Sequence, residues 1–181
     1  STIGNTPPII LLAAVEPEHV PLGEQLKAKV EARDPDQDQV TVLYRWKRNG
    51  EVLREGPEDT LDTTGLKLGD LLQVEVVARD PQSQGKVVLS MPAIVSNGAP
   101  RIVSQPRTDI VAGRYEYLVQ ATDPEGEVLT YQLETAPPGM QIDKQTGQII
   151  WQSTSEQVGR HRVRVVVQDQ TGTTSFQEFE L

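Results

Sequence analysis

Apolar and polar residues alternate along most of this 181-residue chain, with the period of two that indicates half-buried β-strands. In the first half the apolar rows are Leu26, Ala28, Val30 and Ala32, then Val40, Val42, Tyr44 and Trp46, then Leu72, Val74, Val76 and Ala78. After the second row, Asn49-Gly50 is typical of a tight hairpin turn, because both residues accept positive φ. Residues 85–96 predict the last strand of this half.

The second half has the same character. Its apolar rows are Tyr115, Tyr117, Val119 and Ala121, then Leu129, Tyr131 and Leu133, then His161, Val163, Val165 and Val167. Helical periodicity is weak throughout. Short strands separated by turn residues favour an all-β protein made of antiparallel β-sandwiches, in which we expect Trp46 and Trp151 to fill the two cores.

Two landmarks show that the halves are repeats. Asn5 and Asn97, each followed within a few residues by proline, stand 97 − 5 = 92 positions apart, and Asp34 and Asp123 stand 123 − 34 = 89 apart. A shared period near ninety predicts one sandwich over residues 1–96 and a second over residues 97–181.

The amino-acid composition argues against several classes of function. The chain has 26 acidic and 17 basic residues, a net charge of −9 and no cysteine, which argues against nucleic-acid or anionic-membrane binding and against thiol chemistry. Residues 9–15 are the longest apolar run, far short of the ~20 that a membrane helix needs. The first residues lack a leader pattern, so we expect a removed leader or a piece of a longer chain.

Particular motifs add a family resemblance. Residues 137–151 (PPGM, ID, TG, then I-x-W) and residues 159–169 (G-x-x-x-V-x-V-x-V-x-D) resemble the cadherin-like, dystroglycan-type immunoglobulin-like domain of bacterial surface proteins. Residues 34–50 and 69–76 resemble a related bacterial immunoglobulin-like module. The resemblance implies tandem immunoglobulin-like and cadherin-like sandwiches in an extracellular, cell-surface or periplasmic protein.

Asp34, Asp36 and Asp38 stand on alternate positions, and two interpretations remain open for them. We favour a turn, in which the oxygen of an Asp-Pro aspartate accepts a nearby backbone N–H. The alternative is calcium, which carboxylates at this spacing can surround. An EF-hand is excluded, because Gln39 and Arg45 occupy the positions of its glycine and bidentate glutamate.

The resemblance extends the calcium interpretation to the second half. In cadherins, an Asp-x-Asp pair joins an asparagine in the linker between modules, and Asp123, Glu125 and Asn97 match these positions. The other acidic clusters of that family are not evident. Asp80-Pro81 has no following acid, which supports turn chemistry for the Asp-Pro dipeptide.

Catalysis has little support, because no nucleophile, phosphate-loop or dinucleotide motif is present and His161 lies on an inward strand position. We therefore expect a non-catalytic structural or adhesive protein that acts as a spacer or binds a protein partner. This expectation includes self-association through strand edges. Exchange of residues 7–17 into a neighbouring copy would make a fibre, although we favour pairing of this segment within its own module. The alternative is a carbohydrate-binding accessory module of a secreted enzyme.

A basic stripe is formed by Arg160, Arg162 and Arg164. The stripe either meets an acidic partner or is a solvated strand face.

Overall fold

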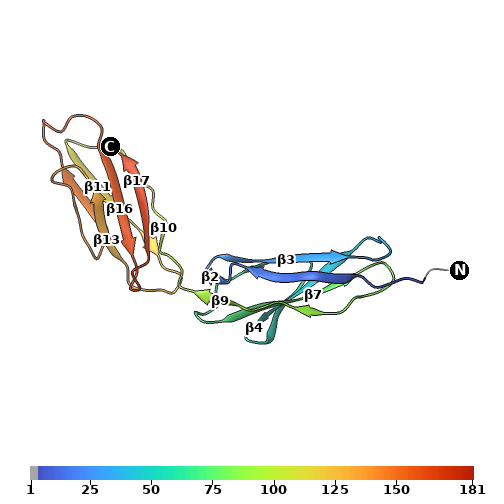
Figure 1. Cartoon of the computed structure of the whole chain (residues 1–181). Helices are drawn as coiled ribbons and strands as arrows, with labels where there is room; N and C mark the ends of the chain where they lie inside the picture. Colours follow the sequence, from blue (N-terminus) through green and yellow to red (C-terminus); the bar gives the residue numbers. More distant parts are fainter. Residues whose placement is uncertain (1–3) are drawn as a thin grey trace. The chain divides into compact units, whose positions relative to one another are not determined.

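The computed structural model describes residues 4–181, which form β-strands and loops and contain no helix (Figure 1). The predicted all-β fold class is therefore confirmed. Contacts divide the chain into two compact units, with the boundary between Ser96 and Asn97. None of the described residues forms a helix of the length and hydropathy needed to cross a membrane.

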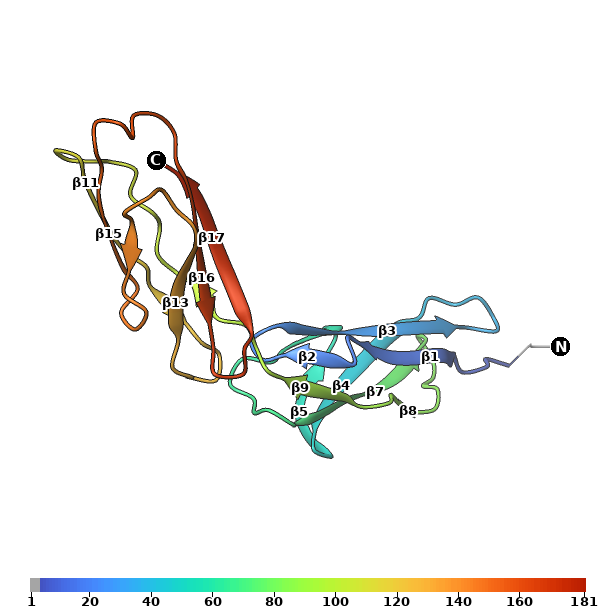
Figure 2. The ribbon, with the colours of Figure 1, turned by 60° about the vertical axis from the view of Figure 1, so that its left-hand side comes forward.

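The first unit is a sandwich of two sheets. One sheet has the order β1-β3-β6, and the other has the order β2-β9-β7-β4-β5 with β8 also paired to β7. Their bounds are β1 Ile9–Glu16, β2 His19–Pro21, β3 Gln25–Arg33, β4 Thr41–Arg48, β5 Glu51–Gly56, β6 Thr60–Asp62, β7 Leu71–Arg79, β8 Val88–Leu89 and β9 Ala93–Ser96. Figure 2 shows β1 and β3 side by side in one layer, and they pair antiparallel within this unit, as the sequence favoured.

The core of the first unit lies between these two sheets. Leu26 and Ala28 of β3 face the β7 row, in which Leu72, Val74, Val76 and Ala78 are fully buried. Trp46 of β4 is only 1% exposed, and its indole N–H donates to the carbonyl of Glu58 at 3.2 Å. The predicted role of Trp46 as a core residue is confirmed. Asn49 and Gly50 turn the chain from β4 to β5 at φ values of 49° and 84°.

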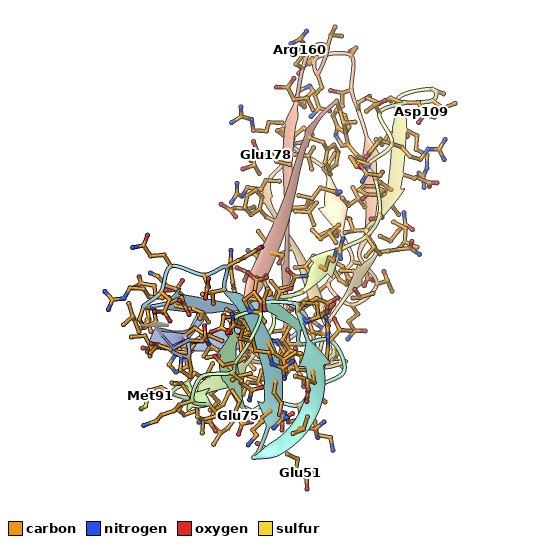
Figure 3. All side chains as sticks on the ribbon, turned by 90° about the vertical axis from the view of Figure 1, so that its right-hand side faces the viewer. Glu51, Glu75, Met91, Asp109, Arg160 and Glu178 are labelled. Carbon is orange, nitrogen blue, oxygen red and sulfur yellow. The ribbon has the colours of Figure 1, made fainter. Side chains whose placement is uncertain are left out.

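The prediction of one strand over residues 85–96 is wrong. The segment forms two short strands: β8 pairs with the middle of β7, whereas β9 pairs with the start of β7 and, in parallel, with β2. Between them Pro92 has no N–H to donate to a sheet. Ser90 is buried and bonds to Val74 through its N–H and its hydroxyl, and Met91 turns outward with 81% exposure (Figure 3).

The second unit is also a sandwich, with sheets β11-β15-β14 and β13-β16-β17 and a short β10-β12 pair. Its strands are β10 Arg101–Ile102, β11 Arg114–Leu118, β12 Ala121–Thr122, β13 Thr130–Thr135, β14 Gln141–Ile142, β15 Gln148–Gln152, β16 Arg162–Gln168 and β17 Thr174–Glu180. The buried core joins β11, β15 and β16 through Tyr115, Trp151 and Val165. Trp151 is 1% exposed and donates to the carbonyl of Pro138 at 3.2 Å, which confirms it as a core residue.

The basic stripe lies on the outer face of the β13-β16-β17 sheet and is paired within the unit. Arg164 donates to Glu178 at 3.0 Å and to Glu134 at 3.3 Å, and its guanidinium stacks 3.7 Å from the ring centre of Phe176. Glu178 projects from the β17 side in Figure 3. The stripe is therefore a solvated strand face whose arginines pair with glutamates of the same unit.

Candidate calcium site

Each unit carries one acidic loop with the same backbone arrangement. In the first unit the loop follows β3, and Oδ1 of Asp34 accepts the N–H groups of Asp36 and Asp38 at 2.8 and 3.2 Å. In the second unit the loop follows β12, and Oδ1 of Asp123 accepts the N–H groups two and four residues on at 2.9 and 3.1 Å. The turn interpretation therefore accounts for one oxygen of each aspartate.

In the second unit, one buried carboxylate oxygen of each acidic residue in this loop has no hydrogen-bond partner. Asp123, Glu125 and Glu127 each offer a carboxylate oxygen, and these oxygens lie within 4.8 Å of one another. Oδ2 of Asp123 and Oε2 of both glutamates are buried and accept no hydrogen bond. Oδ1 of Asn97 is a fourth such oxygen. Buried polar atoms are almost always paired in folded proteins, so a group of four points to a missing partner.

The orientation of Asn97 is fixed by its surroundings. Its amide nitrogen lies 2.9 Å from Oδ2 of Asp169, 3.0 Å from Oγ1 of Thr171 and 3.1 Å from Oγ1 of Thr173. An ionised aspartate only accepts hydrogen bonds, so the nitrogen of the amide must face Asp169. The amide oxygen of Asn97 is then the atom left without a hydrogen-bond partner.

Asp169 is the residue that holds this amide. Its Oδ1 accepts the N–H groups of Thr171 and Thr173, each at 2.9 Å, while its Oδ2 accepts from Asn97. Burial opposes ionisation, but these hydrogen bonds outweigh it and lower the pKa of Asp169 below its ordinary value. Asp169 therefore stays charged and acts as a positioning residue for Asn97.

The electrostatics of the cluster are unfavourable for the carboxylates alone. Burial, with the neighbouring charge of Asp123 added, raises the pKa of Glu125 above its ordinary value. Burial and the charges of Asp169, Asp123 and Glu125 raise the pKa of Glu127 in the same way. Such shifts arise when like charges crowd in a partly desolvated place, and a bound cation would remove the penalty.

The donor set suits calcium. Ca²⁺ takes six to eight oxygen ligands from carboxylates, amide or backbone carbonyls and water, in flexible geometry. Three carboxylates and the Asn97 amide supply four such oxygens, and all four are the unpaired atoms described above. The cluster offers no nitrogen or sulfur ligand, which argues against a zinc site.

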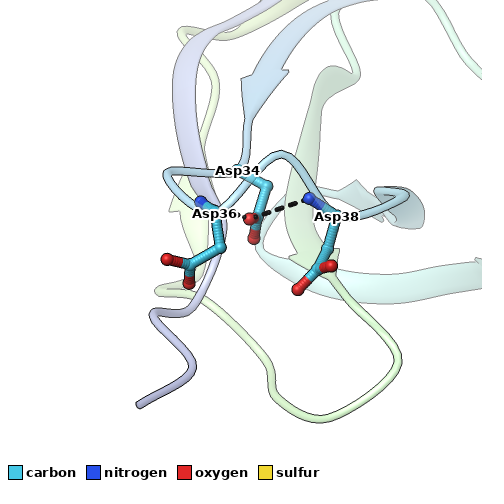
Figure 4. Close-up of side chains that lie close together, drawn as sticks. All are labelled: Asp34, Asp36 and Asp38. Carbon is cyan, nitrogen blue, oxygen red and sulfur yellow. Dashed lines mark hydrogen bonds between the residues drawn. The ribbon is translucent and has the colours of Figure 1, made fainter. Parts of the chain in front are cut away.

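The first unit repeats this loop in a more open form (Figure 4). The carboxylate of Asp34 lies between those of Asp36 and Asp38, and one oxygen from each lies within 4.8 Å of the others. Asp34 is 7% exposed, and its Oδ2 is buried without a partner. Asp36 and Asp38 are exposed, and Oδ2 of Asp36 accepts the N–H of Thr6 at 2.6 Å.

The structure thus brings together all three predicted acids of the first unit, and it brings Asn97, Asp123 and Glu125 together in the second. Sequence reasoning missed Glu127 and Asp169. A signal for Glu127 was present, because 125 − 36 = 89 and 127 − 38 = 89 continue the period set by the first aspartates. Glutamate in place of aspartate hid the match.

Other candidate sites are weaker. His161 packs edge-on against Trp151 at 5.3 Å between ring centres, and its Nε2 lies 2.8 Å from the carbonyl oxygen of Gln157. A hollow of about 600 Å³ lies between β13 and β14, and Tyr131 is the aromatic residue in its lining. Tyr131 is only 9% exposed, so its ring offers little face for stacking on a sugar.

The fold and the acidic loops define a class: tandem β-sandwich modules of the immunoglobulin-like and cadherin-like kind. Residues 93–181, which include the whole second module, match the family model of the Putative Ig domain, He_PIG. This match confirms the resemblance found in the sequence of the second module. Comparison with curated proteins finds no match.

Solved structures give more distant similarity. Sidekick-1 immunoglobulin domains 1-5 align over 99% of this chain and 39% of that chain, with 18% identity and a TM-score of 0.37. Protocadherin Gamma B2 cadherin domains 3-6 align over 99% and 52%, with 19% identity and a TM-score of 0.40. An endo-fucoidan hydrolase of glycoside hydrolase family 107 aligns over 90% and 32%, with 18% identity and a TM-score of 0.40. The chain therefore spans about half or less of these structures.

Proposed function

We propose that this chain is a non-catalytic extracellular or cell-surface protein whose tandem modules act as a spacer and bind a protein partner. Immunoglobulin-like folds of this kind are typical of adhesive and structural extracellular modules. In each module taken alone, the chain starts at one end of the sandwich and leaves at the other, as Figures 1 and 2 both show. A module threaded in this way adds its length to the chain, which suits a spacer.

Calcium binding by the second module is part of the proposal. The observation that carries it is the set of four buried, unpaired oxygens of Asn97, Asp123, Glu125 and Glu127. Asn97 and Gly98 belong to the segment that starts the module, and Gly98 N–H donates to Glu125 at 2.7 Å. A cation held there would tie this segment to the loop that follows β12, so calcium would stiffen and stabilise the start of the module.

Thermal melting of the full chain tests calcium binding. A ligand that binds only the folded state adds about 2.7 kcal/mol at a concentration of about 100 times its Kd, enough to raise the Tm of a module of this size by roughly 10–20 °C. We expect calcium to raise the Tm of the wild type and not that of Asp123→Asn. In chelator the Tm of Asp123→Asn should be higher than that of the wild type, because the substitution relieves repulsion among the carboxylates.

Asp143→Asn is the matched control. Oδ1 of Asp143 accepts the N–H groups of Gln145 and Thr146, each at 2.8 Å, so it makes the same kind of turn outside either acidic cluster. This variant should keep the full calcium response. Melting curves of the wild type that coincide in calcium and in chelator would leave only the turn interpretation for the loop.

Association through a strand edge is the second part of the proposal. Among the strands of residues 4–181, β5 pairs only with β4, and Val52 and Leu53 on it are 55% and 43% exposed. An open edge with exposed apolar side chains can accept a strand from a partner or from another copy. Sedimentation velocity over a range of concentrations tests whether another copy of this chain binds there.

We expect concentration-dependent association of the wild type that Val52→Lys with Leu53→Lys removes, since charge on an edge strand opposes pairing. A wild type that stays monomeric at high concentration would refute self-association. A pull-down with the wild type and the double variant as baits would then test for a different protein partner. Such a partner should bind the wild type and not the double variant.

A further inference from the structure

The first module repeats the acidic loop of the second module's site and also the contacts that surround this loop. Asn5 stands where Asn97 stands in the second module, and its amide nitrogen donates to Oδ2 of Asp80 at 3.0 Å and to Oγ of Ser83 at 2.7 Å. Asp80 is the counterpart of Asp169, because 169 − 80 = 89. Its Oδ1 accepts the N–H of Gln82 at 2.7 Å, as Asp169 accepts that of Thr171.

The remaining contacts correspond in the same way. Thr6 N–H donates to Asp36 at 2.6 Å, and Gly98 N–H donates to Glu125 at 2.7 Å. Gln37 has a φ of 66° at the position where the second loop has Gly126 with a φ of 75°. A non-glycine residue with positive φ is uncommon, so the first loop keeps this backbone shape at some energetic cost.

One buried oxygen of the first module's loop has no hydrogen-bond partner. Asp34 is 93% buried, by its 7% exposure, and its Oδ1 is occupied by the two backbone N–H groups of the turn. Its Oδ2 is buried with no hydrogen bond, and the carboxylate that carries this oxygen belongs to the cluster formed with Asp36 and Asp38. A turn uses only one oxygen, so it gives no reason for burying the second. An unpaired buried carboxylate oxygen is costly unless a cation meets it.

We infer that the first module holds a second divalent-cation site, suited to calcium, formed by Asp34, Asp36 and Asp38 with the amide oxygen of Asn5. Asp80 and Ser83 are positioning residues that hold the amide nitrogen of Asn5 and so leave its oxygen for the ion. The inference extends the calcium binding proposed for the second module to a module outside the matched family region of residues 93–181.

The two sites should differ in affinity. In the second module, four buried side-chain oxygens have no hydrogen-bond partner, whereas in the described part of the first module, residues 4–96, only Oδ2 of Asp34 has none. Asp36 and Asp38 are exposed aspartates, shorter than the half-buried glutamates at the matching positions. An exposed side chain must be ordered when the ion binds, and water must complete the coordination. The site of the first module should therefore be the weaker one.

Calcium stoichiometry of the full chain, measured by equilibrium dialysis, tests the inference. We expect two ions per chain for the wild type, one for Asp34→Asn, one for Asp123→Asn, and none for the double variant. Asp34→Asn should lose the weaker ion and Asp123→Asn the tighter one. Asp143→Asn, the turn control outside both clusters, should keep both ions. Far-UV circular dichroism in chelator checks that each variant is folded.

Asp36→Asn provides a second variant at an exposed position, and Asn5→Ala tests the amide oxygen. Both should weaken or remove one ion and leave the other. One ion per chain, lost in Asp123→Asn and unaffected by Asp34→Asn, Asp36→Asn and Asn5→Ala, would overturn the inference while leaving the proposed function intact. One ion per chain that is lost in Asp34→Asn, weakened in Asp36→Asn and Asn5→Ala, and kept in Asp123→Asn would support the inference and contradict calcium binding by the second module. Absence of any bound ion would overturn both.

Discussion

Gly147 allows a sharp test of packing in the second module. It has a φ of +77°, and a Cβ added to it would lie 2.6 Å from the carbonyl oxygen of Val119 and 3.1 Å from the ring of Tyr131. Gly139 has a similar φ of +86°, but an added Cβ would meet no atom within 4 Å. Replacing either residue by alanine therefore carries the same backbone penalty, and only Gly147→Ala adds a steric clash.

The two costs can be separated. A left-handed conformation costs an alanine roughly 1–2 kcal/mol, which is the expected destabilisation for Gly139→Ala. Crowding a packed site adds about 1–3 kcal/mol, so Gly147→Ala should cost roughly 2–5 kcal/mol in total. The carbonyl of Val119 belongs to the backbone, and Val119 N–H also donates to the carbonyl of Gly147 at 3.0 Å, so this contact cannot relax without breaking a hydrogen bond.

Urea unfolding measures both costs. In a Trp46→Phe background the fluorescence of Trp151 reports the second module alone, because these are the two tryptophans of the chain. The midpoint should fall further for Gly147→Ala than for Gly139→Ala at an unchanged m-value. Equal midpoints for the two alanine variants would refute the close approach of Gly147 to Val119 and Tyr131.

Three further outcomes are expected. Trp46→Ala and Trp151→Ala should each destabilise their own module by roughly 3–5 kcal/mol in urea unfolding, and a change near zero would mean an exposed ring. Burial opposes ionisation of Asp70, but hydrogen bonds and a nearby arginine lower its pKa below the ordinary 3.8. Its contribution to stability should therefore be complete above that value and be lost as pH falls through the folded-state pKa, and Asp70→Asn should reduce this slope in acid-dependent melting. Gly85→Ala should release the start of β1, because the added Cβ would clash with the carbonyl oxygen of Pro8, and amide hydrogen exchange should be faster in β1.

Much of the fold could be predicted because alternation directly reports which face of a strand is buried. Val163, Val165 and Val167 were placed inward by parity, and all three are fully buried. The break at Ser90 to Pro92 was missed because alternation does not show where a strand changes its partner. β8 and β9 both pair with β7, but at different positions along it.

The candidate site was only partly predictable for a different reason. Asp34 and Asp123 stand out locally, because Asp-Pro followed by acids is visible in a short window. Asp169 lies 72 residues from Asn97, and only the fold brings the two side chains together. Asp80 was interpreted as plain turn chemistry for the same reason, because its bond to Asn5 spans 75 residues. Sequence spacing does not show such long-range contacts.

An X-ray structure of the full chain crystallised with calcium tests the cation site most directly, through the anomalous difference map at the start of the second module. We expect one strong peak at about 2.3–2.6 Å from the unpaired oxygens of Asn97, Asp123, Glu125 and Glu127, with Asp169 still bonded to the Asn97 amide nitrogen. A map with no peak there at saturating calcium, and with the three carboxylates bonded to water alone, would contradict it.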